Sequence, residues 1–244
     1  MSTFPEPSAP VALVTGATSG IGREVARKLA ADGFAVLVHG RDAARGAAVA
    51  DEITTGGGQA LFIAADLTSV SEIERLADAA GDVDVLVNNA GFSWFGPTAD
   101  LPPDTFDRLF AANVRSAYYL VAAIAPRMAK RGTGSIVNLG SMAGQVGLAG
   151  GAAYSATKAA LASLTRSWAA EFSPQGVRVN TVASGPAYTG GAAPERIEAL
   201  GGTTLLARAA QPEEIADVVA FLASPKAGYI TGAVIAADGG RTAI

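Results

Sequence analysis

The sequence predicts an α/β protein built on a doubly wound, mainly seven-stranded parallel sheet with helices on both faces. Short apolar runs alternate with helical patterns along the chain, as they do where helices connect parallel strands. The runs are apolar at successive positions, as expected of strands that are covered on both faces. Polar and glycine-rich segments follow these runs, at the sheet edge where such proteins bind ligands.

The predicted elements alternate from the first strand to the last. Strands are predicted at 11–15, 35–39, 60–65, 84–88, 134–139, 177–182 and 233–236. Helices are predicted at 21–32, 42–55, 70–80, 103–130, 154–172 and 212–223. Right-handed crossovers between parallel strands then wind the sheet in both directions.

Each element rests on a local pattern. The first strand is the run Val11–Val14, and the helix after it has apolar residues at positions 25, 26, 29 and 30. The second strand ends in Val38-His39-Gly40-Arg41, and the third and fourth strands end in Asp66 and in Asn88–Gly91. The two longest helices, 103–130 and 154–172, are apolar around most of their circumference.

The chain is predicted to form one domain with a short arm. A length of 244 residues suits a single α/β domain with a large core, so 11–244 is interpreted as one catalytic domain. Residues 1–10 contain three prolines and no apolar signal segment, and we expect a flexible N-terminal arm there. No internal repeat or interdomain linker interrupts the pattern.

Composition excludes several classes of function. The chain has no cysteine and one histidine, which argues against disulfides, thiol catalysis and a metal site, so no metal is expected. A net charge of −4 offers no basic surface for nucleic acid. No apolar run reaches the ~18 residues needed to cross a bilayer. We therefore expect a cytoplasmic protein that acts on a small molecule, without a membrane or nucleic acid as partner.

A glycine-rich turn follows the first strand. The segment Thr15-Gly16-Ala-Thr-Ser-Gly20-Ile-Gly22 lies between that strand and the first helix. Free backbone N–H groups and the helix dipole favour an anion at such a place, and glycine lets the backbone approach it closely. The turn is therefore interpreted as a pyrophosphate site, although a plain tight turn would have a similar composition.

A second motif has the residues for proton transfer. Tyr154 and Lys158 are four apart on a predicted helix, so they project to the same side. A free tyrosine titrates near about 10, and a nearby ammonium favours the phenolate, so a lowered pKa of Tyr154 is expected. Ser141 could add a hydroxyl that orients a carbonyl oxygen. Taken alone, the spacing is also that of a common helix-surface pair.

Together these motifs resemble the short-chain dehydrogenase/reductase family in its single-domain, Rossmann-fold form. The resemblance covers about residues 9 to 240 and rests on seven motifs in the family's order. They are Thr15-Gly-x3-Gly-Ile-Gly22, Asp66-Leu67, Asn88-Asn-Ala-Gly91, Asn113, Ser141, Tyr154-x3-Lys158 and Val179-Asn180.

The resemblance implies a set of site residues and a reaction. The implied catalytic residues are Asn113, Ser141, Tyr154 and Lys158, with Tyr154 as acid/base for hydride transfer between a nicotinamide cofactor and a ketone or secondary alcohol. In the family the asparagine binds a water that links the lysine to solvent. The implied cofactor-binding residues are Gly16, Thr18, Ser19, Gly20, Ile21, Gly22, Arg41, Asp66, Leu67, Asn89, Ala90, Gly91, Tyr154, Lys158, Gly185 and Thr189.

The end of the second strand predicts a preference for NADP(H) over NAD(H). An acidic residue about 20 positions after the glycine turn would bind the ribose hydroxyls of NAD, but Gly40 stands there and Arg41 follows. Arginine can pair with a 2′-phosphate. Ser19 is neutral where some NADP(H) enzymes have a basic residue, and whether Arg23 reaches the phosphate is left open. His39 is interpreted as a strand-end residue rather than a catalytic one.

Two further residues have structural alternatives to their implied roles. Asp66 is expected to contact the adenine amino group, while an N-cap within 66–69 is an equally physical interpretation. Asn113 lies inside a predicted helix, where asparagine is a mediocre former, and it could also stabilise a kink, since the two roles are not exclusive.

The substrate is only broadly constrained by the sequence. An apolar pocket is predicted from Phe92, Trp94 and Phe95, from 143–148 and from 185–208, with no arginine or lysine immediately within it and a mobile lid at 190–202. Ser184 replaces a proline common in the family. A reductase of small or medium ketones is therefore preferred. The first alternative is a 3-oxoacyl-[acyl-carrier-protein] reductase, and a non-catalytic dinucleotide-binding regulatory protein is a remote one.

The acyl-carrier alternative is weakened by two observations. Gly151 stands where those reductases often have glutamine, and the segment 171–176 lacks a basic residue for an acidic carrier protein.

The helices predicted at 103–130 and 154–172 are apolar on more than one side, and the sheet can cover only one side of each. A second subunit is expected to cover the rest, so a homotetramer or homodimer is predicted.

Overall fold

The computed structural model describes residues 9–191 and 193–244, so the predicted arm at 1–10 lies outside the described residues except for its last two positions. Within the described residues, seven strands form one sheet in the order β3-β2-β1-β4-β5-β6-β7, and every neighbouring pair is parallel. The strands are β1 Val11–Val14, β2 Ala35–Gly40, β3 Gln59–Ala64, β4 Val85–Asn88, β5 Gly134–Ser141, β6 Val177–Ser184 and β7 Val234–Ala237. The predicted seven-stranded parallel sheet is confirmed.

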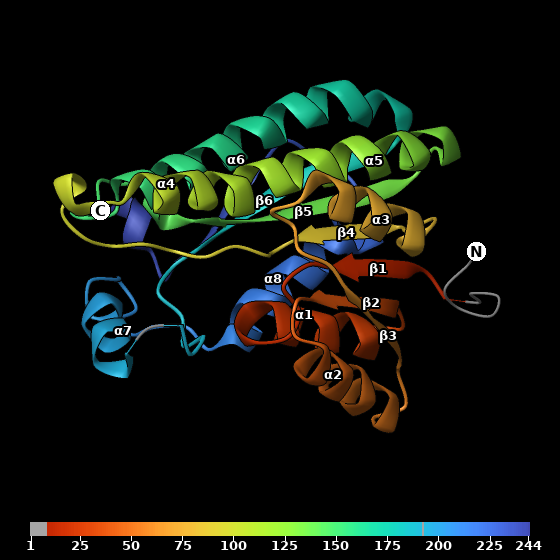
Figure 1. The fold of residues 1–244 in the computed structure, drawn as a ribbon, viewed down its shortest axis with the longest axis horizontal. Coiled ribbons are helices and arrows are strands. Elements are labelled where there is room, and N and C mark those ends of the chain that lie inside the picture. Colours follow the sequence, from red (N-terminus) through yellow and green to blue (C-terminus); the bar gives the residue numbers. More distant parts are fainter. Residues whose placement is uncertain (1–8, 192) are drawn as a thin grey trace.

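Helices cover both faces of this sheet (Figure 1). They are α1 Gly20–Ala31, α2 Ala43–Thr55, α3 Val70–Ala80, α4 Pro103–Phe110, α5 Ser116–Arg131, α6 Ala152–Phe172, α7 Pro194–Gly201 and α8 Pro212–Ala223. One apolar cluster joins α3, α5 and α6 to the sheet, and a second cluster joins α1, α2 and α8 to the other face. Within β1, Leu13 belongs to the first cluster and Val14 to the second, because successive strand side chains alternate between faces.

The strand order places a switch point beside β1. The chain runs from β1 outward to β3, then returns to β4 on the other side of β1. Ligands of open α/β sheets bind outside the carboxyl ends of the strands at such a point. The glycine-rich turn and the segment after β4 therefore meet there, although more than 70 residues separate them in the sequence.

The helix predicted at 103–130 is not continuous. It consists of α4, a π-helical segment at Ala111–Arg115 and α5, which includes Pro126. A π-helical turn inserts one extra residue into a helix and often marks a functional site. Asn113 lies within this segment, and its side chain supports the interruption, as described below.

The lid predicted at 190–202 contains a helix that the glycine- and alanine-rich sequence did not suggest. Helix α7 begins with Pro194 at its first position and Glu195 in its first turn, both of which are common helix-start signals. Residue 192, within the predicted lid, lies outside the described residues. Figure 1 places α7 beyond the sheet, on the side where the parallel strands end.

The described part of the chain, 9–191 and 193–244, contains no helix long and apolar enough to cross a membrane. Among these same residues, histidine and carboxylate side chains form no group of three or more that could hold a metal ion.

Candidate active site

The glycine-rich turn after β1 forms a close-fitting cradle. Gly16 has a φ of +63°, and a Cβ there would come 2.9 Å from the Cα of Ala90. A Cβ on Gly22 would come 2.3 Å from the carbonyl oxygen of Gly16. Real Cβ atoms do not approach other atoms so closely, so glycine is required at both positions.

The start of α1 is available to an anion. Ser19 occupies the N-cap position, but its side chain makes no capping hydrogen bond, and the first turn has no acidic residue. The backbone N–H groups at a helix start lack intrahelical partners, and the helix dipole adds partial positive charge. Gly20, Ile21 and Gly22 lie in this turn, so the helix start there offers N–H donors of the kind that bind anions.

Thr15 and Asn89 join the turn to the segment after β4. The Thr15 hydroxyl donates to Val87 O and accepts from the backbone N–H groups of Asn89 and Ala90, each at 3.0 Å. The Asn89 amide donates to the carbonyl oxygens of Thr15 and Gly16 at 2.8 and 3.0 Å. Asn89 and Ala90, both predicted cofactor-binding residues, are therefore fixed against the cradle.

His39 fastens the other side of the same turn. The Gly16 N–H donates to Nδ1 of His39 at 3.2 Å, while Nε2 lies 3.1 Å from the carbonyl oxygen of Ala65. Only a neutral ring with its proton on Nε2 makes both bonds. Burial lowers the pKa of His39 to about 4, which keeps the ring neutral near pH 7. His39 therefore positions the turn, a role that the sequence did not reveal.

The end of β2 carries an exposed cation. Among the residues that the structure describes, Arg41 makes no hydrogen bond or ion pair, although it lies near enough to Asp66 to lower the pKa of that carboxyl. The hydrogen bond from the Thr68 N–H, 3.0 Å long, is the main cause of that lowered pKa. Leu67 is buried, and Ser69 rather than Asp66 caps α3. The side chain of Asp66 thus caps no helix.

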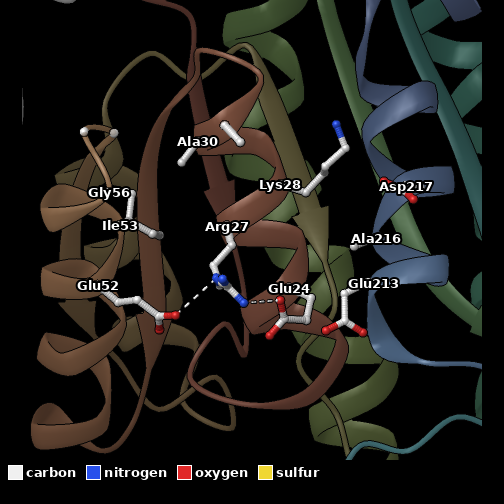
Figure 2. Close-up of a pocket in the computed structure, with 13 residues that line it drawn as sticks. Glu24, Arg27, Lys28, Ala30, Glu52, Ile53, Gly56, Glu213, Ala216 and Asp217 are labelled. Atoms are coloured by element: carbon white, nitrogen blue, oxygen red, sulfur yellow. Dashed lines mark hydrogen bonds and ion pairs between the residues drawn. The ribbon is translucent and has the colours of Figure 1, made fainter.

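Arg23 belongs to a charge network that joins α1 to α2. It pairs with Glu52 at 2.7 Å and with Glu24 at 3.2 Å. Arg27 pairs with the same two carboxylates, at 2.8 Å to Glu24 and 3.2 Å to Glu52, and Figure 2 shows it bridging them. This network lines a cleft of about 500 Å³ between α1, α2 and α8, away from Tyr154. The Arg23 guanidinium is therefore engaged in ion pairs with two carboxylates of its own chain.

Tyr154 and Ser141 come together where β5 ends and α6 begins. Ser141 is the last residue of β5, and its hydroxyl lies close enough to the Tyr154 phenol to lower the pKa of that group. Burial has the larger effect and raises the pKa of Tyr154 above its ordinary value. The lowered pKa expected from the sequence was wrong for this structure, because removal from water disfavours the charged phenolate.

Lys158 lies on the same side of α6, one turn further along. Its Nζ is 5.7 Å from the centroid of the Tyr154 ring and donates to the carbonyl oxygen of Leu139 at 2.7 Å. Burial lowers the pKa of Lys158 to about 8. An ammonium has three donors, so two remain for other partners in the site.

Asn113 joins the π-helical segment to the loop after β4 and to α6. Its Oδ1 accepts from the Phe92 N–H at 3.0 Å, and its Nδ2 donates to Phe92 O at 2.9 Å and to the Thr157 hydroxyl at 3.1 Å. Asn113 also packs on Gly91, where a Cβ would come 2.7 Å from its Oδ1. The side chain is thus occupied by structural bonds directly beside Lys158.

The loop after β6 closes the cradle. Thr189 lies against Gly20, where an added Cβ would come 3.1 Å from the Thr189 Cβ. Gly185 packs on Asp238, leaving only 2.6 Å between an added Cβ and that residue's Cα. Ser184 is the last residue of β6 and pairs in register with Ser141. Thr189 thus lies against the glycine-rich turn, whereas Gly185 lies against Asp238, just after β7.

Aromatic side chains mark the substrate side. The Phe95 ring lies 5.5 Å from the Tyr154 ring, tilted by 59°. Phe92 is more exposed and lies 5.8 Å from the guanidinium carbon of Arg108. The guanidinium carbon of Arg196, on α7, lies 4.4 Å from the Phe95 ring centroid. This corrects the prediction that the pocket segments lack a nearby arginine.

Comparison with known proteins places the chain among oxidoreductases. The model of the family described as enoyl-(acyl carrier protein) reductase matches residues 16–242. A cis-4-hydroxycyclohexanecarboxylate dehydrogenase of Sinomonas cyclohexanicum is 40% identical over 243 residues, covering 96% of this chain and 97% of that protein.

Solved structures agree in fold and length. A short chain dehydrogenase/reductase family protein is 50% identical, with a TM-score of 0.89 over 96% of this chain and 98% of that one. The angucycline C-6 ketoreductase LanV with bound NADP is 34% identical, with a TM-score of 0.90 over 96% of each chain.

Proposed function

The chain belongs to the short-chain dehydrogenase/reductase family, and from that premise we propose that it is an NADP(H)-dependent reductase of small or medium ketones. Its relatives are oxidoreductases of alcohols and ketones, which supports this class of reaction. In the reverse direction the same site oxidises a secondary alcohol. The observation that carries the proposal is the Ser141 hydroxyl beside the Tyr154 phenol, with buried Lys158 one helical turn away and its Nζ 5.7 Å from the Tyr154 ring centroid.

A nicotinamide dinucleotide fits the cradle at the switch point. The uncapped start of α1 and the close approach allowed by Gly16 and Gly22 suit a pyrophosphate. Lys158, with two donors left over, would hold the nicotinamide-ribose hydroxyls. The residues Asn89–Gly91, Gly185 and Thr189 would line the nicotinamide half, and Asp66 would face the adenine.

NADP(H) suits this cradle better than NAD(H). Arg41 is exposed and has no ion-pair partner among the described residues, so it can pair with a 2′-phosphate. The acidic side chain that would bind the ribose of NAD is absent at position 40. Thr18 lies against Gly40, which leaves no room for one without rearrangement.

The proposed reaction is a ketone reduction with tyrosine as acid. The cofactor supplies a hydride to the carbonyl carbon. Ser141 holds the carbonyl oxygen, and the Tyr154 hydroxyl donates its proton to that oxygen, so a secondary alcohol is formed. A phenol with a raised pKa is protonated near pH 7, which is the form that this direction needs. The ammonium of Lys158 stabilises the phenolate left behind.

In this proposal Asn113 has a positioning role and does not contact the substrate. Its three hydrogen bonds fix the loop after β4 against α6 and so set the distance between the cradle and Tyr154. Positioning of this kind contributes to catalysis without contact with the reacting atoms.

A 3-oxoacyl-[acyl-carrier-protein] reductase is the second candidate, because a solved structure described as a putative betaketoacyl-ACP reductase is 47% identical to this chain. Arg127 and Arg131 would be part of a carrier-binding surface, but both are paired with aspartates of their own chain, Asp78 and Asp82. A regulatory protein without turnover would not need the Ser141, Tyr154 and Lys158 arrangement.

We further propose that the protein assembles as a homotetramer or homodimer, because the aromatic side chains of Tyr118 and Tyr119 are exposed on α5. We also propose that it is cytoplasmic.

A panel of ketones tests the proposal. Oxidation of NADPH and of NADH is followed at 340 nm with cyclic, linear and β-keto thioester substrates. Turnover of simple ketones with a preference for NADPH is expected. Turnover of carrier-linked β-keto thioesters alone would favour the second candidate, and absence of turnover with every ketone and both cofactors would contradict the proposed function.

A further inference from the structure

The substrate side of the site holds a cation that the proposed reaction does not use. Arg196 is the third residue of α7, and its side chain is exposed. Within 9–191 and 193–244 its guanidinium makes no hydrogen bond or ion pair, and it contacts the Phe95 ring. Arg208, the other arginine of the segment after β6, is instead held by Glu214 through two hydrogen bonds of 2.7 Å. Arg196 is therefore the cation of this segment that has no counter-ion.

The position of Arg196 relative to the proton donor is defined by Phe95. The guanidinium carbon lies 4.4 Å from the Phe95 ring centroid, and that ring lies 5.5 Å from the ring of Tyr154. The two separations place the guanidinium within about 10 Å of the Tyr154 ring. A ketone held at the phenol and extended across Phe95 would reach Arg196 at its far end.

The chemistry of a guanidinium over an aromatic ring defines what it can bind. The planar group stacks on the ring by its face, and its N–H donors at the edge stay available to a second partner. Those donors match the two oxygens of a carboxylate. Without such a partner, the guanidinium of Arg196 contacts the Phe95 ring and solvent.

We propose that Arg196 binds a carboxylate on the substrate, so that the preferred substrates are keto acids whose charged group lies across Phe95 from the reacting carbonyl. This inference rests on the proposed function, because it presumes that the carbonyl is held at Ser141 and Tyr154. It deepens that function by naming the substrate class. It also gives α7 a role, since the helix would close on the substrate through the same contact.

The test compares a keto acid with a neutral ketone of similar shape. The ratio of kcat/KM for 4-oxocyclohexanecarboxylate to that for 4-methylcyclohexanone is measured with NADPH for the wild type, Arg196→Gln and Arg196→Lys. The neutral ketone reports any loss of fold or of lid closure. Lys130→Gln, which removes an exposed positive charge at the far end of α5, is the matched control.

The wild type should prefer the keto acid, and Arg196→Gln should lower that preference about tenfold or more, chiefly through KM, because a charge-assisted pair is lost. Arg196→Lys should retain part of the preference, and Lys130→Gln all of it. An equal loss on both substrates would make Arg196 a lid contact only and overturn the proposal. An unchanged ratio in Arg196→Gln, or no preference in the wild type, would do the same.

A binding measurement separates this inference from the proposed function. Cyclohexanecarboxylate is titrated into the enzyme–NADPH complex, and nicotinamide fluorescence reports binding without turnover. A Kd that rises about tenfold in Arg196→Gln, but not in Lys130→Gln, supports the anchor even if no ketone is reduced. Equal affinity of wild type and Arg196→Gln for the carboxylate would refute the anchor while leaving the reductase activity standing.

Discussion

The methyl group of Thr18 lies over Gly40, where an added Cβ would come 2.4 Å from the Thr18 Cγ2. The Thr18 side chain, in the glycine-rich turn, thus occupies the space that a side chain at position 40, at the end of β2, would need. An acidic residue at position 40 would require the Thr18 side chain to shift. The adjacent Arg41 is exposed, and its side chain makes no ion pair within the described residues.

Replacing Arg41 should change cofactor choice. Loss of a charge-assisted pair is worth about 1.5–3 kcal/mol, so the wild type should prefer NADPH about tenfold or more, and Arg41→Asp should shrink or reverse the preference. The measurement is kcat/KM for each cofactor. Arg45→Gln, an exposed arginine of α2 paired with Asp42, serves as control. Equal efficiency of the wild type with both cofactors would refute the role of Arg41.

Removing the Tyr154 hydroxyl should abolish most turnover without unfolding the protein. Tyr154→Phe keeps the ring against Phe95 but removes the proton donor, so kcat should fall by ~10²–10⁴ while NADPH still binds. Lys158→Ala should reduce both turnover and cofactor affinity. Tyr229→Phe, at a fully exposed position, is the control. A Tyr154→Phe enzyme with a tenth of wild-type kcat would contradict the assignment.

The stability of the protein should depend on pH through its one histidine. The pKa of His39 is about 4 when folded and about 6.5 when unfolded, so the unfolded chain binds more protons between these values and stability falls as pH falls. From pH 7.5 to 5.0 the loss from this group should be about 2 kcal/mol.

Urea unfolding of the wild type and of His39→Gln at both pH values measures this effect. The variant should be less stable at pH 7.5, because the Gly16 N–H loses its acceptor in the correct place. It should lose less stability than the wild type on acidification. Identical pH dependence in the two proteins would show that His39 is not buried in its neutral form.

Charges placed on α5 or α6 should weaken assembly. Tyr118 and Tyr119 are 47% and 41% exposed on α5, and the Tyr118 ring lies 6.2 Å from Trp168 on α6. Tyr119→Glu or Leu164→Glu should lower the oligomer mass seen by light scattering and reduce activity, since α6 carries Tyr154 and Lys158. Ala47→Glu on exposed α2 is the control. A wild type that is monomeric and fully active at micromolar concentration would remove the hypothesis.

The strands and most helices could be predicted because their signals are local. Seven apolar runs became seven strands, with ends within about two residues of the prediction. The π-helical segment at 111–115 could not be foreseen, since it depends on Asn113 finding partners in Phe92 and Thr157, distant in sequence. Helix α7 was missed because a glycine- and alanine-rich segment gives little periodic signal.

Several predicted site residues were brought together, while their electrostatics were not foreseen. Ser141, Tyr154 and Lys158 meet as the motif predicts, since they lie on two adjoining elements. The raised pKa of Tyr154 depends on burial, which one sequence does not show. The bonds of His39 to Gly16 and Ala65 join three segments, so no pattern around position 39 indicates them.

The hydrogen bonds that the Thr15 hydroxyl accepts from the N–H groups of Asn89 and Ala90 limit when this site can form during protein synthesis. The turn leaves the ribosome well before its partners, because Asn89 follows Thr15 by 74 residues. At ordinary translation rates that gap lasts roughly 4 to 15 seconds. Throughout that interval the nascent cradle lacks the strand that closes it, and nucleotide cannot stabilise it. A nascent chain stalled before residue 90 has emerged should therefore fail to retain NADPH, whereas the completed protein is expected to bind it.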